Sequence, residues 1–185
     1  GTLTTGWVGL FQPVPFFLSR GPRAGPGESA EVSVGTAGRK IKLFADGADL
    51  NEIKKFRDRG VIDGFTSNPF FLKKYGVKDY ERFIRQAVEM FPDLSMSFEV
   101  LSDDLAAMER EALKIAGWAE NCHIKIPITN TQGQSTKDVI KSLSAQGVKL
   151  NVTVVFTPAQ ARVAVQALSP DVSSYISVFA GRIAD

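Results

Sequence analysis

From residue 40 onward, short apolar segments alternate with longer segments whose apolar residues recur at helical spacing. The short segments have the length and the β-branched content of strands, and the longer ones are typical of amphipathic helices. Strands are predicted at residues 41–46, 61–66, 94–100, 122–129, 148–156 and 174–179. Helices are expected to begin near residues that can cap a helix N-terminus, namely Asp49, Asp79, Ser102, Ser135 and Thr157.

This regular βα alternation predicts a parallel sheet with helices packed on it. Two architectures are built from such units, the (β/α)8 barrel and the doubly wound open sheet. The units here are close in length to those of an average barrel, about 31 residues each. An open sheet more often carries a glycine-rich phosphate turn after its first strand, but the turn here is Asp46-Gly47-Ala48-Asp49. We therefore predict an α/β fold of the TIM-barrel type over residues 40–185, truncated after its sixth strand.

The strand at residues 122–129 places a lysine in an unusual position. Side chains alternate along a strand, so Ile124 and Ile126 take one face while His123 and Lys125 take the other. Desolvation in such a position favours the neutral, nucleophilic amine, and Lys125 is a candidate Schiff-base lysine. The alternative is a structural lysine that is ion-paired or extends to water. His123 lies lower in the strand and is expected to serve packing.

The same alternation gives the other strands one polar face. That face carries Asp46 on the first strand, Glu99 on the third and Ser177 on the sixth. Asn151 and Thr153 lie on the polar face of the fifth strand. A single buried polar side chain can be a satisfied core group. Polar groups from several strands at the C-terminal end of one face indicate instead a functional site, because barrel enzymes place catalysis there.

Composition narrows the class of protein. The 185 residues are 44% hydrophobic and 23% charged, as in soluble globular proteins. The net charge of +2 is small, and scattered Lys and Arg give no reason to expect nucleic-acid binding. The single cysteine excludes an internal disulfide, and the single histidine argues against a histidine-rich metal site. We expect a cytoplasmic protein, because a membrane-spanning apolar run is lacking and the cysteine content fits a reducing compartment.

Residues 1–39 have a different character. Trp7–Leu18 is apolar but interrupted by Pro13 and Pro15, and residues 21–38 are rich in Gly, Pro, Ala and Ser. We interpret this segment as a flexible leader, a remnant of a transit peptide or a segment added in cloning.

Six motifs on the predicted strands resemble those of the transaldolases, which are Schiff-base aldolases with a barrel fold. Each is short, but together they occur in order at βα spacing from Lys40 to Asp185. The organisation resembles the shorter transaldolases, which lie near fructose-6-phosphate aldolase. The motifs are Leu43-Phe44-Ala45-Asp46, Thr66-Ser67-Asn68-Pro69, Ser97-Phe98-Glu99, Ile124-Lys125-Ile126-Pro127, Leu150-Asn151-Val152-Thr153 and Ser177-Val178-Phe179-Ala180-Gly181-Arg182-Ile183.

The resemblance implies transfer of a dihydroxyacetone unit from a ketose phosphate, sedoheptulose 7-phosphate or fructose 6-phosphate, to an aldose phosphate in the pentose phosphate pathway. It implies that Lys125 forms the imine, that Asp46 is the general acid/base, and that no metal or organic cofactor is needed. Glu99 and Thr153 would hold the water of imine formation and hydrolysis. The resemblance assigns substrate binding or support of the site to Thr66, Asn68, Asn151, Ser177, Phe179 and Arg182, with Arg182 on the phosphate.

Two positions bear on the choice between transfer and simple aldol cleavage. Aldolase relatives tend to carry Gln at the position of Glu99 and Tyr at that of Phe179, so this sequence favours transfer. The alternatives are a fructose-6-phosphate aldolase-type lyase and a noncatalytic truncated barrel that acts as an interaction protein. Because six strands cannot close an eight-strand barrel, we expect exposed edges, low stability and self-association, with a homo-oligomer the result.

Overall fold

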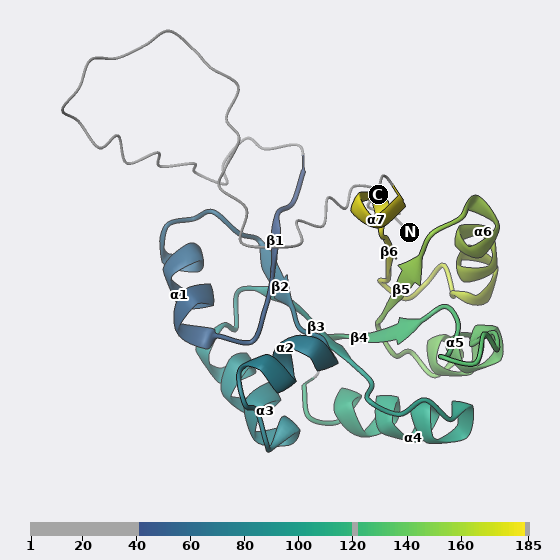
Figure 1. Cartoon of the computed structure of the whole chain (residues 1–185), viewed down its shortest axis with the longest axis horizontal. Coiled ribbons are helices and arrows are strands. Elements are labelled where there is room, and N and C mark those ends of the chain that lie inside the picture. The colour runs from purple at the N-terminus through teal and green to yellow at the C-terminus, as the bar shows by residue number, and fades with distance from the viewer. Residues whose placement is uncertain (1–40, 120–121, 184–185) are drawn as a thin grey trace, which may run out of the picture.

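The computed structural model describes residues 41–119 and 122–183 and contains a parallel sheet with helices around it (Figure 1). The described strands are β1 (Phe44–Asp46), β2 (Gly64–Thr66), β3 (Ser95–Glu99), β4 (Cys122–Pro127), β5 (Leu150–Val155) and β6 (Tyr175–Val178). The described helices are α1 (Leu50–Asp58), α2 (Pro69–Lys74), α3 (Tyr80–Met90), α4 (Leu105–Ala116), α5 (Lys137–Ala145), α6 (Pro158–Ala167) and α7 (Ala180–Ile183).

The strands follow one another in the sheet in chain order, β1-β2-β3-β4-β5-β6, and each neighbouring pair is parallel. A doubly wound sheet would reverse its strand order near the middle, so this order confirms the barrel-type architecture. Helices α1, α3, α4, α5 and α6 form an arc around one side of the sheet (Figure 1). Within the described residues the sheet is therefore a half-barrel of six strands.

The curvature of the sheet brings distant strands into contact through Tyr175 of β6. Its ring lies edge-on to that of Phe44 on β1, with centroids 5.8 Å apart, and its hydroxyl is 3.2 Å from the Ser95 hydroxyl on β3. The His123 ring on β4 lies 4.4 Å from the Tyr175 ring. These side chains form a layer at the N-terminal end of the interior, which we call the lower layer. His123 packs there, as the sequence predicted.

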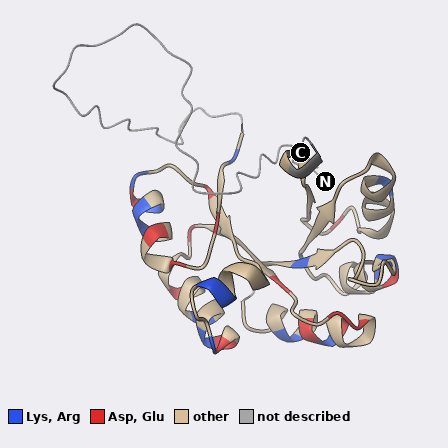
Figure 2. Cartoon of the chain, in the orientation of Figure 1, with Lys and Arg blue, Asp and Glu red and all other residues tan. Residues whose placement is uncertain are grey.

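The outer face of the sheet carries the hydrophobic core. The side chains that point toward the helices from β2, β3, β4 and β5 have no solvent exposure: Phe65, Met96, Phe98, Ile124, Ile126 and Val152. Burial of each such side chain stabilises the fold by roughly 1.5–3 kcal/mol. Charged residues of both signs mix along the outer surfaces of α1, α3 and α4 (Figure 2). The apolar alternation in the sequence thus marks the helix-facing side of each strand.

Three helix starts agree with their predicted capping residues. Asp49 accepts hydrogen bonds from the first turn of α1, and Asp79 accepts one from α3. Thr157 and Gln160 form the complete capping box of α6, with Pro158 in the first turn. These caps were predictable because each depends on residues within one helical turn.

Two helix starts differ from their predicted capping residues by one or two positions. Helix α4 is capped by Asp104 rather than Ser102, whose backbone N–H instead donates to the Glu111 carboxylate at 2.8 Å. At α5, Thr136 takes the N-cap position, but its hydroxyl donates to the Pro127 carbonyl of β4 at 2.6 Å, and the Ser135 hydroxyl accepts a hydrogen bond from the Lys137 backbone N–H at 3.3 Å. In both cases a contact outside the first helical turn decides where the helix begins.

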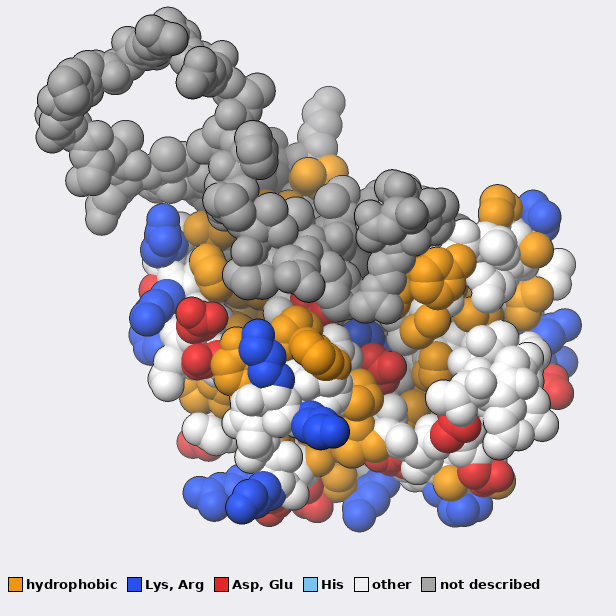
Figure 3. Space-filling model, in the orientation of Figure 1, with side chains coloured by type: hydrophobic (Ala, Val, Ile, Leu, Met, Phe, Trp, Pro, Cys, Tyr) orange, Lys and Arg blue, Asp and Glu red, His pale blue; other side chains and the backbone are white. Residues whose placement is uncertain are grey.

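Helix α2 was not predicted. Asn68 caps it by accepting a hydrogen bond from the Phe71 backbone, and Pro69 takes the first helical position. Phe70 in this helix and Tyr75 directly after it are exposed aromatic side chains. Figure 3 shows hydrophobic side chains beside Lys and Arg side chains on the face in view. Helix α2 matters for the site because it fixes Asn68 directly after β2.

Strand β5 contains an irregularity at its C-terminal end. Its pairing with β6 shifts register between Val152 and Val155, and Val154 has φ of 61°. A β-branched residue in this left-handed region is strained, and β-bulges often occur beside functional sites. Thr153 lies within this irregular stretch, next to Val154.

The described residues do not test every prediction from the sequence. The predicted leader, residues 1–39, lies outside the described part of the chain, so its nature stays a prediction. In the described ranges, 41–119 and 122–183, no helix has the length and apolarity required to cross a membrane.

Candidate functional site

The amine of Lys125 lies inside the half-barrel between β3 and the end of β2. Lys125 is 5% exposed, and its Nζ is 3.2 Å from the Glu99 carboxylate and donates to the Ser67 carbonyl at 3.2 Å. Glu99 and Lys125 are direct partners in the β3–β4 register, which explains how adjacent parallel strands bring them together. The nitrogen is therefore turned inward, away from solvent, as the sequence predicted.

Asp46 is the carboxylate at the end of β1. It accepts hydrogen bonds from the Thr66 hydroxyl at 2.7 Å and from the Asn68 amide at 3.2 Å. Burial raises the pKa of Asp46, while the charge of Lys125 and the two hydrogen bonds act in the opposite direction. Thr66 is the register partner of Asp46 on β2, so the strand pairing itself sets this contact.

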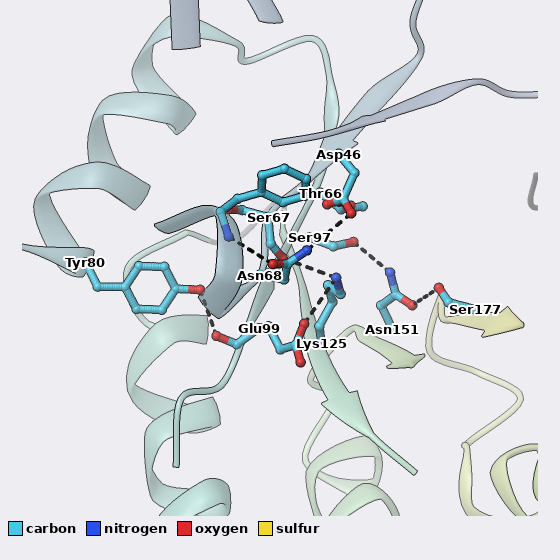
Figure 4. A network of polar contacts seen from close by, with 11 residues as sticks. Asp46, Thr66, Ser67, Asn68, Tyr80, Ser97, Glu99, Lys125, Asn151 and Ser177 are labelled. Atoms are coloured by element: carbon cyan, nitrogen blue, oxygen red, sulfur yellow. Dashed lines mark hydrogen bonds and ion pairs between the residues drawn. The ribbon is translucent and has the colours of Figure 1, made fainter. Parts of the chain in front are cut away.

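The second carboxylate, Glu99, experiences the same balance. Burial raises its pKa, Lys125 lowers it through its charge and hydrogen bond, and the negative charge of Asp46 raises it again. Figure 4 shows the three groups of Asp46, Glu99 and Lys125 directed into one region. Two buried carboxylates with raised pKa beside one amine are suited to general acid/base chemistry.

A second polar chain crosses the interior beside this group. The Asn151 amide donates to the Ser97 hydroxyl at 3.1 Å, and the Ser177 hydroxyl donates to the Asn151 side-chain oxygen at 2.6 Å (Figure 4). All three residues are buried. They join β3, β5 and β6, so the polar face predicted from alternation is one connected surface.

Two buried hydroxyls near these strand ends have no hydrogen-bond partner among the described residues, those of Thr153 and Ser67. Thr153 is 1% exposed and Ser67 is fully buried. Buried polar atoms without a partner are rare in folded proteins and call for an explanation such as a water or ligand. Both hydroxyls are available to a polar molecule in the interior.

The remaining predicted site residues follow β6. The Phe179 ring packs edge-on against Phe156 with centroids 5.5 Å apart, and its backbone N–H donates to Val155 at 2.9 Å. Arg182 belongs to α7, and the role predicted for its side chain lies outside what the structure describes. Thus eight of the ten predicted residues come together through the contacts above or line the same interior: Lys125, Asp46, Glu99, Thr153, Thr66, Asn68, Asn151 and Ser177.

Sequence reasoning assigned no role to three residues that the structure brings into the network, Ser67, Ser97 and Tyr80. Ser97 lies on the polar face of β3 and could have been found from alternation alone. Ser67 contributes its backbone carbonyl, and Tyr80 comes from α3 to contact the Glu99 backbone, so the side-chain pattern carries no signal for either. Over the described ranges, no group of three or more His, Cys, Asp or Glu residues could hold a metal ion.

The strand order and the surrounding helices define the class of fold as an α/β half-barrel of the TIM-barrel type, with a buried amine in its interior. The solved structure of "QR15, an Aldolase" shares this fold. The superposition covers 80% of this chain and 72% of the QR15 chain, with a TM-score of 0.52 and 13% sequence identity.

The family model for Transaldolase/Fructose-6-phosphate aldolase matches residues 43–185, and the chain belongs to this family. Relatives named "Probable transaldolase" come from Geobacter sulfurreducens at 39% identity, Aquifex aeolicus at 37% and Dehalococcoides mccartyi at 35%. Each matches over 145 residues, or 78% of this chain. The chain spans 63%, 62% and 63% of the length of these three relatives, respectively.

Proposed function

We propose that this chain carries the reaction centre of a transaldolase, in which Lys125 forms a Schiff base with a ketose phosphate. The observation that carries the proposal is the placement of one buried amine beside the Glu99 carboxylate at 3.2 Å, with Asp46 on the same interior face. A structural ion pair would need one carboxylate. Two carboxylates with raised pKa around one lysine favour a site that moves protons.

The first half of the reaction uses Lys125 as nucleophile. The Glu99 carboxylate takes a proton from the Lys125 ammonium group, and the resulting neutral amine adds to the C2 carbonyl carbon of the ketose. Glu99 then gives that proton to the departing hydroxyl group, which leaves as water, and a protonated imine remains. The Asp46 carboxylate then takes the proton of the C4 hydroxyl. The C3–C4 bond breaks, its electron pair moves toward the imine nitrogen to form an enamine, and the aldose phosphate leaves with a new carbonyl at the former C4.

The second half reverses these steps with another aldose phosphate. The enamine carbon attacks the aldehyde carbon of the second aldose phosphate, and Asp46 returns its proton to the resulting alkoxide. Water then hydrolyses the imine. The unpartnered Thr153 hydroxyl and the Glu99 carboxylate are suited to hold that water. This scheme uses only side chains, so it needs neither a metal nor an organic cofactor.

The remaining residues are proposed to bind the sugar phosphate. Asn68, Asn151 and Ser177 offer amide and hydroxyl groups for the sugar hydroxyls, and Thr66 holds Asp46 in place. Arg182 is assigned to the phosphate, which suits the planar donor fork of its guanidinium. Phe179 would line the site from the end of β6. Participation in the pentose phosphate pathway, a cytoplasmic location and a homo-oligomeric state belong to the same proposal.

Reductive trapping tests the imine. Fructose 6-phosphate is added with borohydride, and the modified peptide is located by mass spectrometry. We expect the adduct on Lys125, its loss in Lys125→Arg, and its retention in the control Lys149→Arg, which changes a lysine at the start of the neighbouring strand. An adduct on another lysine, or none in the folded wild type, would refute the mechanism.

The transferase and the lyase give different products in the same assay. A transferase consumes fructose 6-phosphate only when an acceptor such as erythrose 4-phosphate is present, whereas a fructose-6-phosphate aldolase releases free dihydroxyacetone without one. Glu99 and Phe179 favour the transferase. Release of dihydroxyacetone at the same rate with and without acceptor would support the lyase instead.

A further inference from the structure

Strand β3 extends beyond the end of its neighbour β2. The last backbone hydrogen bond between them runs from Ser67 N–H to the Ser97 carbonyl at 3.0 Å. On the opposite side, Val100 N–H donates to the Lys125 carbonyl at 3.2 Å. Because successive backbone groups of a strand face alternate neighbours, the Glu99 carbonyl faces the β2 side, where the strand has already ended.

A side chain from helix α3 replaces the missing strand. The Tyr80 hydroxyl donates to the Glu99 backbone carbonyl at 2.7 Å (Figure 4). Burial raises the pKa of Tyr80 well above its usual value, and the charges of Glu99 and Glu111 raise it further. The shift favours the protonated phenol, which is the form that donates this hydrogen bond.

A second side chain holds the residues that follow. The Glu111 carboxylate, from α4, accepts hydrogen bonds from the backbone N–H groups of Leu101 at 2.9 Å and Ser102 at 2.8 Å. Tyr80 and Glu111 thus bind the chain at Glu99 and directly after it. Leu101 itself is 49% exposed, so packing of its side chain does little to fix this segment.

We propose that Tyr80, assisted by Glu111, is a positioning residue that sets the Glu99 carboxylate against Lys125. The consequence for catalysis rests on the proposed Schiff-base function. Glu99 is the last residue of β3, so its backbone is restrained by β4 on one side and by Tyr80 on the other. Its side chain must meet the lysine amine at 3.2 Å. Release of the carbonyl lets this strand end rotate, and the carboxylate then loses its contact with the amine.

The test is Tyr80→Phe, which removes the hydroxyl and keeps the ring. We expect kcat/KM to fall about 5-fold, the size of effect of one lost hydrogen bond. The charged groups that act on Glu99 are Lys125, which lowers its pKa, and Asp46, which raises it. When the Lys125 contact is lost, only burial and the charge of Asp46 still act on the pKa of Glu99, and both raise it. The acidic limb of the pH–rate profile should therefore move to higher pH.

Tyr75→Phe is the matched control, because it removes a hydroxyl from a 42% exposed tyrosine outside the proposed machinery. It should change neither the rate nor the profile. At the second anchor, Glu111→Ala should reproduce the shift of the acidic limb, while Glu111→Gln, which keeps an oxygen acceptor for the two N–H groups, should restore the wild-type profile. A Tyr80→Phe variant that only unfolds more easily, with an unmoved acidic limb, would overturn the proposal.

A measurement without turnover separates this proposal from the proposed function. The Glu99 carboxyl can be titrated by NMR in protein labelled with carbon-13 glutamate, with Glu99→Gln to assign its signal. We expect the titration midpoint to rise in Tyr80→Phe and to stay unchanged in Tyr75→Phe. If wild-type protein forms no trapped adduct but the midpoint moves, the Schiff-base function fails and the positioning role stands. An unmoved midpoint refutes the positioning role whatever the enzyme does.

Discussion

Acid should destabilise this protein through His123, the imidazole of the lower layer. His123 is 6% exposed and packs on the Tyr175 ring. Burial lowers the pKa of His123 from 6.5 to about 4, the positive charge of Lys149 acts in the same direction, and the Met96 backbone opposes them weakly. Neither ring nitrogen makes a hydrogen bond of ordinary geometry to a described residue. The folded protein therefore holds this ring in its neutral form.

The magnitude follows from the difference in proton binding. An unfolded chain binds a proton at His123 below about pH 6.5, whereas the folded protein resists it until about pH 4. Stability that depends on this group is complete above the unfolded pKa and is lost as the pH falls toward the folded one. Between pH 7 and pH 5 the loss amounts to about 2 kcal/mol, a large part of the stability of a typical domain.

The assay compares wild type with His123→Phe by urea unfolding at pH 7 and pH 5. Phenylalanine keeps an aromatic ring against Tyr175 but cannot take up a proton. The chain has a single histidine, and its carboxylates titrate alike in both proteins, so the difference between the two pH-dependent changes isolates His123. We expect wild type to lose about 2 kcal/mol more than the variant. Equal losses in the two proteins would refute the reasoning.

Three further predictions concern single positions. Gly64→Ala should lower the stability by about 3 kcal/mol in urea unfolding. A Cβ at this position would lie 2.2 Å from the Ser95 carbonyl oxygen and 2.4 Å from the Phe44 ring, so wild-type stability in this variant would contradict the packing. Cys122 is 4% exposed, and burial raises the pKa of its thiol to about 12. Iodoacetamide at pH 8 should therefore leave Cys122 unmodified in native protein and alkylate it in urea, as measured by mass spectrometry. Rapid labelling of the native protein would contradict this burial. Thr153→Val should raise the stability by about 1 kcal/mol in urea unfolding, because it removes a buried hydroxyl that has no hydrogen-bond partner among the described residues. It should also lower the rate of turnover, and a loss of stability would show that the hydroxyl is satisfied.

The sequence predicted the interior face correctly because strand alternation is a local property. Met96 and Phe98 are fully buried on the helix side, so Ser97 and Glu99 must face the interior. Consecutive parallel strands then brought Glu99 beside Lys125 without any further information. The Thr157 cap was equally predictable, since its partner is Gln160. The order of the elements and the side of the sheet that each side chain faces therefore followed from patterns that span one strand or one helical turn, whereas the roles assigned to the interior residues came from the family resemblance.

Contacts between residues that are far apart in the sequence were not predicted from these local patterns. Ser102 has the chemistry of a cap, but the Glu111 carboxylate of α4 accepts a hydrogen bond from its backbone N–H. Tyr80 reaches the carbonyl of Glu99, and the hydroxyl of Tyr175 approaches that of Ser95. No pattern along the chain encodes these pairs, because curvature of the sheet and packing of the helices decide them. Asn68-Pro69 does carry a local helix-start signal, because Asn is a common cap and Pro favours the first helical position.

The interior group of charges and the apolar outer face are two sides of one energetic balance. The raised pKa values of Asp46 and Glu99 mean that folding favours their protonated forms, so each contributes stability at low pH that is lost as the pH rises through its folded pKa. Above that range two carboxylates share one ammonium group, and the site costs stability. The fully buried apolar residues on the helix side of β2, β3, β4 and β5 offset this cost. A sheet with one face buried against helices can therefore keep charged and polar side chains on its opposite face.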